Sequence, residues 1–335
     1  MNIILTTRCN KNCSFCFANK VMREKPAEDM TLANFSGLVE LACRDNPRPQ
    51  GLKLLGGEPT MHPQFVEILD FLTARQIQVS LISNLLYEDE KVRMRIYQAA
   101  RDGVIVGGLA NAAELGSSNK MQIFKDNFNA LREALGRRDF QRDLAAGITL
   151  SRHKSSAEEV AYVEYLSQNL EISALRISLD FLGDNVRDTF FINNKEYGQK
   201  FLAVIHKCLD LRIPASGDCK MYPCMFEPKN FRKDIQGFIQ RIRTACLAGA
   251  APFDVLPDMS YIHCYPARKL SGQNILKFSH LSEALGEITF LKKSLQSLGR
   301  EDLPPECRVC DYYKTNRCDS LCLGCRELAV GFLDN

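Results

Sequence analysis

Short apolar runs alternate with longer amphipathic stretches from the first residue to about residue 212. The short runs are rich in Val, Ile and Leu and are bounded by polar or glycine positions, which predicts β-strands. The predicted strands are residues 2–7, 51–55, 78–83, 103–109, 145–151 and 174–179. The amphipathic stretches predict helices after Thr31, from Pro63 onward, and near 88–101, 119–137, 155–168 and 194–211.

Six strand–helix repeats predict an α/β fold with a parallel sheet and helices on its outer side. Six units are too few to close an eight-stranded barrel, so the sequence favours an open, partial (β/α)6 TIM-like barrel over residues 1–212. In such sheets the active site forms at the carboxyl ends of the strands. Polar and cysteine-rich segments follow the first and second predicted strands, and we expect them to meet there.

The pattern changes after residue 212. Residues 253–256 and 260–263 predict a hairpin, and amphipathic stretches follow near 279–298. The last 30 or so residues are dominated by cysteine and turn residues, with too few apolar residues for an ordinary core. Metal clusters can supply the missing stability. Residues 213–335 are therefore expected to form a small α+β metal-binding extension.

Charge and composition narrow the classes of partner. The net charge of +3 gives no electrostatic reason to expect nucleic acid or an anionic membrane as a partner. No apolar run approaches the roughly 20 residues that span a bilayer, and the first residues lack the marks of a signal peptide. We expect a cytoplasmic protein. In a reducing compartment, its 14 cysteines point to metal binding or catalysis rather than disulfides.

Three of these cysteines, Cys9, Cys13 and Cys16, lie within eight residues directly after the first predicted strand. Three thiolates can hold three irons of a four-iron cluster and leave the fourth iron open. The alternative is a structural zinc site completed by a distant Cys or His. The C-x3-C-x2-C spacing, with Phe15 before the third cysteine, resembles the cluster loop of the radical S-adenosylmethionine (SAM) superfamily.

The resemblance implies a [4Fe–4S] cluster whose open iron binds SAM. It implies reductive cleavage of SAM to a 5′-deoxyadenosyl radical that abstracts a substrate hydrogen, with an electron donor such as flavodoxin or ferredoxin. It further implies SAM contacts from Gly56, Gly57, Glu58, Pro59, Ser83, Asn84, Ser151, Arg152 and Arg176. The alternatives are that Ser83 and Asn84 cap a turn and that Arg176 faces outward. His62 is expected to begin a helix rather than to catalyse.

The later cysteines resemble the SPASM extension, which carries two auxiliary [4Fe–4S] clusters in some radical SAM enzymes. The resemblance implies that Cys307, Cys310, Cys318 and Cys325 bind the terminal cluster, and that Cys246, Cys264 and Cys322 bind the inner one. Cys219 and Cys224 are both candidates for the fourth inner ligand, unless that iron is open. One or two zinc sites are the alternative. Cys43 and Cys208 fall on apolar helical patterns and are expected to be buried small hydrophobes.

Three departures set this tail apart from the SPASM pattern. Met259 replaces the hairpin glycine, seven residues rather than five separate Cys310 from Cys318, and the final cysteine comes early.

SPASM-bearing enzymes mostly modify ribosomally made peptides, so the leading hypothesis is a peptide maturase. The cluster loop begins at residue 9, so a separate peptide-recognition protein or a directly bound short peptide is expected. The alternatives are a dehydrogenase or carbon-skeleton enzyme acting on a sugar or alcohol, and a non-enzymatic electron-transfer protein or iron–sulfur scaffold.

Overall fold

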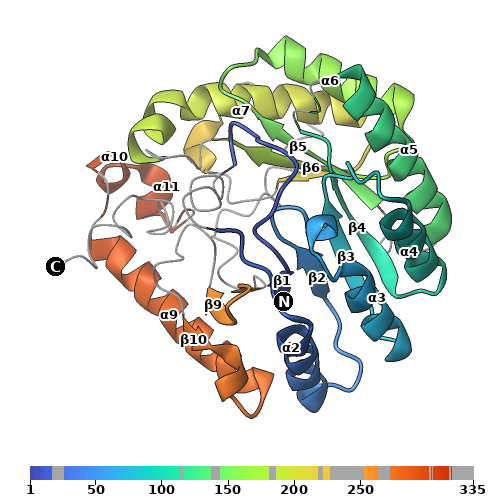
Figure 1. Ribbon diagram of the computed structural model, residues 1–335. Coiled ribbons are helices and arrows are strands. Elements are labelled where there is room, and N and C mark those ends of the chain that lie inside the picture. The colour runs from blue at the N-terminus through green and yellow to red at the C-terminus, as the bar shows by residue number, and fades with distance from the viewer. Residues whose placement is uncertain are drawn as a thin grey trace.

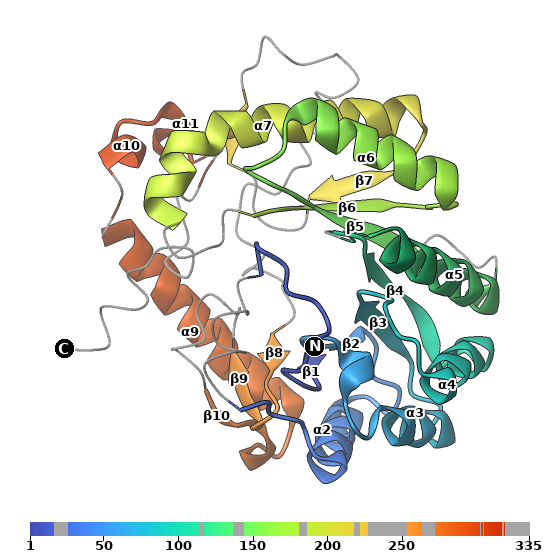
Figure 2. The same ribbon diagram turned by 45° about the horizontal axis from the view of Figure 1, so that its top comes forward.

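The computed structural model describes residues 1–16, 26–113, 115, 117–136, 144–180, 186–217, 222–226, 253–262, 272–301, 303, 305–316 and 318. Within these residues the strands form a ten-stranded sheet in the order β10-β9-β8-β1-β2-β3-β4-β5-β6-β7. Helices cover its outer side, as Figures 1 and 2 show. The strands are Asn2–Ile4 (β1), Leu52–Leu55 (β2), Val79–Ser83 (β3), Ile105–Asn111 (β4), Leu144–Leu150 (β5), Leu175–Leu179 (β6), Ala215–Gly217 (β7), Asp254–Val255 (β8), Ser260–Ile262 (β9) and Gly272–Asn274 (β10).

The parallel βα arrangement predicted from the sequence is confirmed. Strands β1 to β7 all pair in parallel, in chain order. The sheet also continues past residue 212, because β7 pairs with β6 and β8 pairs in parallel with β1. The sheet is not closed, so the fold is a partial barrel extended at both of its edges.

The helices are Leu32–Asp45 (α2), Phe65–Ala74 (α3), Glu90–Arg101 (α4), Ser118–Leu135 (α5), Ser156–Asn169 (α6), Val186–Asp210 (α7), Leu281–Glu301 (α9), Pro305–Arg308 (α10) and Asp311–Lys314 (α11). Most helices agree with the amphipathic stretches, but α7 begins at residue 186 rather than 194, and two short helices, α10 and α11, were not predicted. As predicted, Thr31 caps α2, and its hydroxyl accepts a 3.1 Å hydrogen bond from the amide of Asn34. Ser155 and Glu158 form a capping box at the start of α6.

Two of the boundary differences lie near the carboxyl ends of the strands. Strand β1 ends at Ile4 rather than residue 7, because the chain turns at Thr6 to form an antiparallel bridge with Asp29. Helix α3 begins at Phe65 rather than Pro63, because a 3-10 turn, Pro59–Met61 (η1), comes first. Both shifts leave backbone just after β1 and β2 outside the regular strands and helices.

The main core lies between the sheet and the outer helices. Phe35 and Leu38 of α2 and Phe124 and Phe128 of α5 are fully buried there. Alternate residues of β3 and β6 are buried, as expected when one face of a strand meets helices. This core fixes the strand ends that carry the site.

The predicted hairpin is confirmed as β8 and β9, which pair antiparallel. Met259, in place of a glycine, adopts a φ of 69° in its turn and is completely buried. A side chain in this left-handed region costs about 1–2 kcal/mol, which the burial of the methionine offsets. The hairpin is thus built without glycine.

Helix α9 docks on α2. Asp45 accepts 2.8 Å and 2.7 Å hydrogen bonds from the ring of His280 and the amide of Ser282. The guanidinium of Arg44 donates to the carbonyl oxygen of Ser279 at 3.1 Å. These contacts tie the later part of the chain to the barrel.

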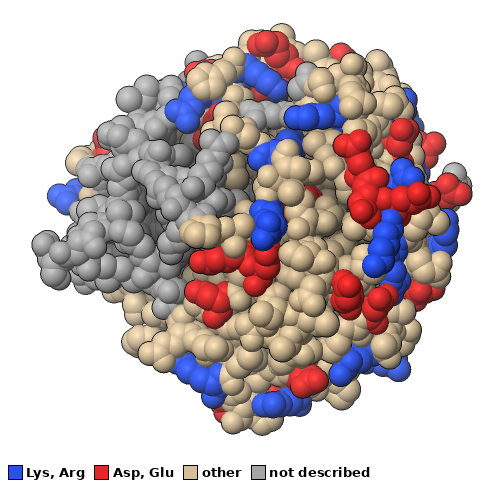
Figure 3. Space-filling model, viewed as in Figure 1, with Lys and Arg blue, Asp and Glu red and all other residues tan. Residues whose placement is uncertain are grey.

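None of the described helices combines the length and apolarity needed to cross a membrane. Acidic and basic side chains are interspersed on the described part of the face in Figure 3.

Candidate active site

The loop that carries Cys9, Cys13 and Cys16 leaves the carboxyl end of β1. The amide of Cys16 donates to the carbonyl oxygen of Cys13 at 3.2 Å, and the amide of Lys11 donates to the sulfur of Cys9 at 3.4 Å. Desolvation, with added contributions from the charges of Glu58 and Cys16, raises the pKa of Cys9. The loop thus turns back on itself between Cys13 and Cys16.

Gly56 and Gly57 are pressed against the start of the cysteine loop. A Cβ on Gly57 would lie 2.2 Å from the carbonyl oxygen of Arg8, and one on Gly56 would lie 2.5 Å from that of Thr6. The amide of Gly57 donates to Thr6 at 2.8 Å, and that of Glu58 donates to Arg8 at 2.7 Å. Only glycine permits this approach, so the motif fixes how the loop leaves β1.

Glu58 is a buried hub rather than an exposed ligand. Its carboxylate accepts hydrogen bonds from the amide and hydroxyl of Thr60, the hydroxyl of Ser83 at 2.8 Å and the amide of Asn84 at 2.7 Å. Complete burial raises its pKa, and these hydrogen bonds oppose the shift. Pro59, also buried, begins η1 directly after it. Glu58 thereby joins the end of β2 to the end of β3.

Asn84 extends this network to the cysteine loop. Its side-chain amide donates to the side-chain oxygen of Asn10 at 2.7 Å, and Asn10 donates to the carbonyl oxygen of Leu86 at 2.9 Å. Lys11 donates to the carbonyl oxygen of Ala113, just beyond β4. The sequence analysis did not single out Asn10. Its only sequence signal is a polar residue inside the loop.

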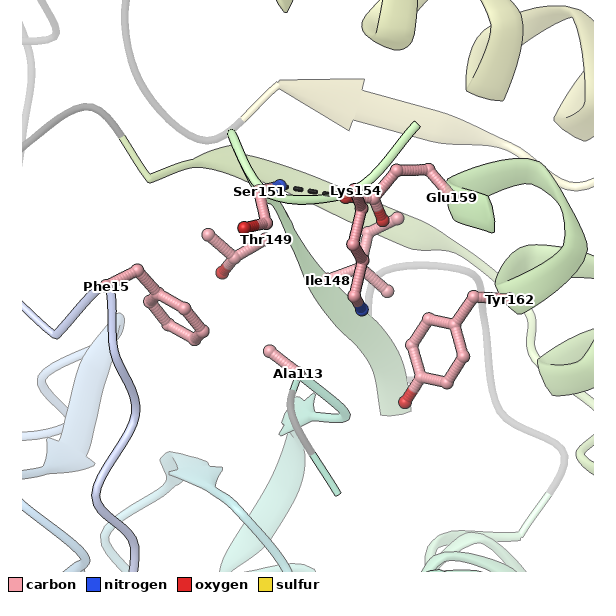
Figure 4. A pocket seen from close by; sticks show the side chains of 8 residues that line it. All are labelled: Phe15, Ala113, Ile148, Thr149, Ser151, Lys154, Glu159 and Tyr162. Atoms are coloured by element: carbon pink, nitrogen blue, oxygen red, sulfur yellow. Dashed lines mark hydrogen bonds between the residues drawn. The ribbon is translucent and has the colours of Figure 1, made fainter. Parts of the chain in front are cut away.

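A small pocket opens next to Phe15 at the carboxyl end of β5 (Figure 4). Phe15 faces Thr149 and Ser151, while Lys154, Glu159 and Tyr162 line the other side. The ammonium of Lys154 lies 5.2 Å from the centre of the Tyr162 ring. The pocket is small and has room for about one water molecule.

Of the eight residues that line the pocket, the sequence pattern pointed to Phe15 and Ser151 and missed the other six, which include Lys154, Glu159 and Tyr162. The latter two lie on α6, and which face of that helix meets the pocket depends on packing. The Ser155–Glu158 capping box fixes where α6 begins, and it is the one sequence signal that bears on this placement.

Ser151 and Arg152 lie at this rim, in line with the prediction that they follow β5. The amide of Ser151 donates to Glu159 at 2.8 Å, and the amide of Arg152 donates to buried Asp180 at 2.9 Å. The guanidinium of Arg152 is 3.9 Å from the same Asp180 carboxylate and is 42% exposed. Arg152 can therefore still reach a ligand.

Arg176 occupies the second position of β6, away from the carboxyl rim. Burial lowers the pKa of Lys53 on β2, and the positive charge of Arg176 lowers it further. Strands β2 and β6 are separated by three strands in the sheet, so this effect acts across the inside of the curved sheet. Arg176 thus faces inward at the amino-terminal half of the strands, and a contact with SAM stays a prediction.

Among the described residues, no three His, Cys, Asp or Glu side chains are arranged to hold a single metal ion. In a four-iron cluster each thiolate binds a different iron, so its ligands need not converge on one point. Cys13 and Cys16 are half-buried and Cys9 is exposed on one loop. This donor set fits an iron–sulfur cluster held by three thiolates.

The structure describes four of the later cysteines: Cys224, Cys307, Cys310 and Cys318. The predicted ligands Cys219, Cys246, Cys264, Cys322 and Cys325 lie outside the described residues.

Three residues that we excluded from the site have structural roles. Cys208 is buried on α7, and burial raises its pKa to about 12, as expected of a thiol in the core. Cys43 is half-buried against the same core. His62 accepts from the amide of Gln64 at its Nδ1, so its Nε2 carries the proton and donates to the carbonyl oxygen of Met30 at 2.8 Å. His62 therefore fixes the turn before α3.

Comparisons with known proteins agree with this geometry. Residues 3–138 match the Radical SAM superfamily. Over 88 residues the chain is 28% identical to an S-adenosylmethionine-dependent nucleotide dehydratase of Selenomonas ruminantium. That alignment covers 25% of this chain and 29% of the relative, so it spans less than a third of either protein.

Two solved structures share the fold. Streptococcus suis SuiB bound to S-adenosylmethionine superimposes with a TM-score of 0.64 at 12% identity, over 93% of this chain and 70% of SuiB. The anSMEcpe protein with bound AdoMet superimposes with a TM-score of 0.62 at 14% identity, over 98% of this chain and 86% of that protein. Residues 3–138, which include the three-cysteine loop, thus match the Radical SAM superfamily, and the chain shares the fold of these two proteins.

Proposed function

We propose that this protein cleaves SAM reductively and uses the resulting radical to modify a peptide. One observation carries the proposal. A continuous set of hydrogen bonds, from Asn10 through Asn84 to Glu58, joins the cysteine loop, the end of β3 and the Gly-Gly-Glu-Pro segment at one rim of the sheet. The pocket beside Phe15 lies next to it.

Cys9, Cys13 and Cys16 would hold the [4Fe–4S] cluster through three of its irons. The chemistry it supplies when bound is one-electron cleavage of SAM to methionine and a 5′-deoxyadenosyl radical, which abstracts a substrate hydrogen. The electron would come from a partner such as flavodoxin or ferredoxin.

The chain's own residues would orient SAM and exclude water. Gly56 and Gly57 would act by positioning the cysteine loop, because their missing side chains let the backbone of Thr6 and Arg8 approach closely. The ring of Phe15 and the hydroxyl of Thr149 lie at the same rim and would contact the edge of SAM. Lys154 and Arg152 are cations at the same rim and suit a carboxylate.

Similarity in fold to two solved structures that contain peptides supports a peptide substrate. SuiB has been crystallised with its precursor peptide SuiA, and that structure superimposes with a TM-score of 0.60 at 13% identity. The anSMEcpe protein with AdoMet and the Cp18Cys peptide superimposes with a TM-score of 0.61 at 14% identity. The cysteine-rich tail adds SPASM-like auxiliary clusters to the proposal, and a separate recognition protein would present the peptide.

The test is to incubate the reduced, reconstituted enzyme and SAM with a precursor peptide encoded by a neighbouring gene. We expect a change in peptide mass or uptake of solvent deuterium, and 5′-deoxyadenosine formed in step with it. An unchanged peptide in the presence of active SAM cleavage would contradict the peptide assignment.

The alignment with the nucleotide dehydratase favours a second candidate, an enzyme acting on a small molecule such as a sugar, an alcohol or a nucleotide. Deuterium placed on the substrate distinguishes the two. Transfer of deuterium into 5′-deoxyadenosine from a labelled small molecule, but not from a labelled peptide, would favour this candidate.

A further inference from the structure

Asn127 lies on α5, one of the outer helices, and is 3% exposed. Its side-chain nitrogen donates two hydrogen bonds of 2.8 Å, one to the carbonyl oxygen of Leu85 and one to that of Tyr87. Its side-chain oxygen accepts a 2.9 Å hydrogen bond from the hydroxyl of Tyr97 on α4, the helix beside α5 in Figures 1 and 2. Both amide hydrogens and the oxygen are thus used, so the partners fix the orientation of the side chain.

The segment that Asn127 holds, residues 84–87, directly follows β3 and is buried. Leu85 has a φ of 54°, in the left-handed region, which a bulky side chain adopts only at a cost in energy. Buried carbonyl groups also need hydrogen-bond partners, and Asn127 supplies them for Leu85 and Tyr87. Asn127 therefore stabilises a backbone conformation that these residues would not favour by themselves.

The carbonyl group between these two is turned to the cysteine loop instead. The oxygen of Leu86 accepts a 2.9 Å hydrogen bond from the side-chain nitrogen of Asn10, and the side chain of Asn84 donates to the oxygen of Asn10 at 2.7 Å. Both ends of the Asn10 amide are thus held by residues 84–87. A continuous series of hydrogen bonds runs from α5 to the residue that follows Cys9.

Packing alone does not account for an asparagine at this position. The other buried residues of α5 are apolar, and Phe124 and Phe128 stack with their ring centroids 6.0 Å apart. A buried amide lowers stability unless it is hydrogen-bonded, so an apolar side chain would serve a packing role better. The feature that singles out Asn127 is its pair of hydrogen bonds to residues 84–87.

We propose that Asn127 is a positioning residue for the cysteine loop. Through residues 84–87 it holds Asn10, and with it the contact in which the amide of Lys11 donates to the sulfur of Cys9 at 3.4 Å. Hydrogen bonds to the sulfurs of an iron–sulfur cluster tune its reduction potential. Asn127 would therefore influence the potential and the affinity for SAM from the outer helix layer, without touching either group. The inference rests on the proposed function in that the loop holds a cluster, and it needs no peptide substrate.

The test compares full-length wild type, Asn127→Leu and Asn127→Asp. In the metal-free proteins, amide hydrogen exchange is measured by mass spectrometry on peptides that cover residues 9–12 and 84–87. After anaerobic reconstitution, the Kd for SAM is measured, together with the reduction potential of the cluster whose EPR signal changes when SAM binds. Phe128→Leu is the matched control, because Phe128 is buried on the same helix and its side chain cannot form a hydrogen bond to residues 84–87. Asn10→Ala, alone and combined with Asn127→Leu, tests the route.

We expect Asn127→Leu to speed exchange in both peptides by about tenfold and to raise the Kd for SAM by about tenfold, with a shifted potential. Asn127→Asp should do the same with almost no change of shape, because carboxylate oxygens would then face the carbonyl oxygens of Leu85 and Tyr87. Phe128→Leu should lower stability but leave the potential and the Kd unchanged. In the Asn10→Ala background, Asn127→Leu should shift the potential no further, because the route is already broken.

Three results would overturn the inference: unchanged exchange of residues 9–12 in both Asn127 variants, equal shifts in Phe128→Leu, or additive shifts in the double variant. The exchange measurement needs no cluster, so it separates this inference from the proposed function. A wild type that never binds a cluster or SAM would contradict the proposed function, while faster exchange of residues 9–12 in the Asn127 variants would still support the positioning role.

Discussion

The side-chain amide of Asn84 donates a 2.7 Å hydrogen bond to the side-chain oxygen of Asn10, which ties the end of β3 to the cysteine loop. The backbone amide of Asn84 is held at 2.7 Å by the buried carboxylate of Glu58. The position of the cysteine loop is thus set by side chains from two neighbouring strand ends.

The Asn10–Asn84 pair should be coupled. We expect Asn10→Ala and Asn84→Ala each to lower the free energy of unfolding by about 1–2 kcal/mol. The double variant should fall short of their sum by about 1 kcal/mol, because the two share one hydrogen bond. Urea unfolding of the wild type, the two single variants and the double variant gives the coupling energy, and the Kd for SAM shows its effect on binding. Strict additivity would mean that the bond contributes nothing to the loop.

Glu58→Gln should lower stability strongly, although glutamine has nearly the same shape as glutamate. The amide NH2 would face the donors of Ser83, Thr60 or Asn84, which leaves buried groups unsatisfied. We expect a loss of about 2–4 kcal/mol in unfolding free energy, together with slower SAM cleavage.

The matched control is Glu40→Gln on α2. Glu40 is 57% exposed and 3.5 Å from Arg75, and such surface pairs contribute about 0–1 kcal/mol. Equal effects of the two substitutions would contradict the hub role of Glu58.

Gly57→Ala should disrupt the loop exit sterically. Its Cβ would lie 2.2 Å from the carbonyl oxygen of Arg8, so the backbone must move. We expect a cost of about 1–3 kcal/mol and reduced iron incorporation. Gly286→Ala is the control: a Cβ there meets nothing within 4 Å on α9, and it should stabilise the helix by about 0.5–1 kcal/mol. Normal iron content in Gly57→Ala would refute the steric argument.

Asp254 predicts a pH dependence of stability at the opposite end of the sheet. Burial raises its pKa from 3.8 to about 6, against the hydrogen bond from Asn2. The folded state therefore holds this proton more tightly than the unfolded state does. The resulting stability is present below about pH 4 and is lost as the pH rises through about 6.

Asp254→Asn should remove this component, by an amount of about 1–3 kcal/mol. Urea unfolding of wild type and variant at several values between pH 4 and 7 measures the difference. A difference between the two proteins that is the same at every pH would show that Asp254 titrates normally.

The sequence predicted the features that repeat along the chain. Strand–helix alternation and the spacing of Cys9, Cys13 and Cys16 are local patterns, and they carried the fold class and the cluster loop. Strand β7 was missed, and β8 was expected only as part of a hairpin. Strands of two or three residues are too short to show a hydrophobic period.

Contacts between distant residues could not be predicted in this way. Asn10 meets Asn84 across 74 positions, and the turn Pro223–Met225 (η2) packs on α7. Met259 shows a third limit. Its left-handed backbone is tolerated because its side chain is buried, which depends on the surrounding core.

The central claim is that the loop of Cys9, Cys13 and Cys16 holds the cluster that cleaves SAM. The direct measurement is 5′-deoxyadenosine formation, with an iron count, for the anaerobically reconstituted wild type and the Cys9/Cys13/Cys16→Ala variant. We predict that the variant loses about four irons and all product while it keeps its auxiliary iron. Product formation by the variant, or a wild type that binds iron but never cleaves SAM under reduction, would contradict the account.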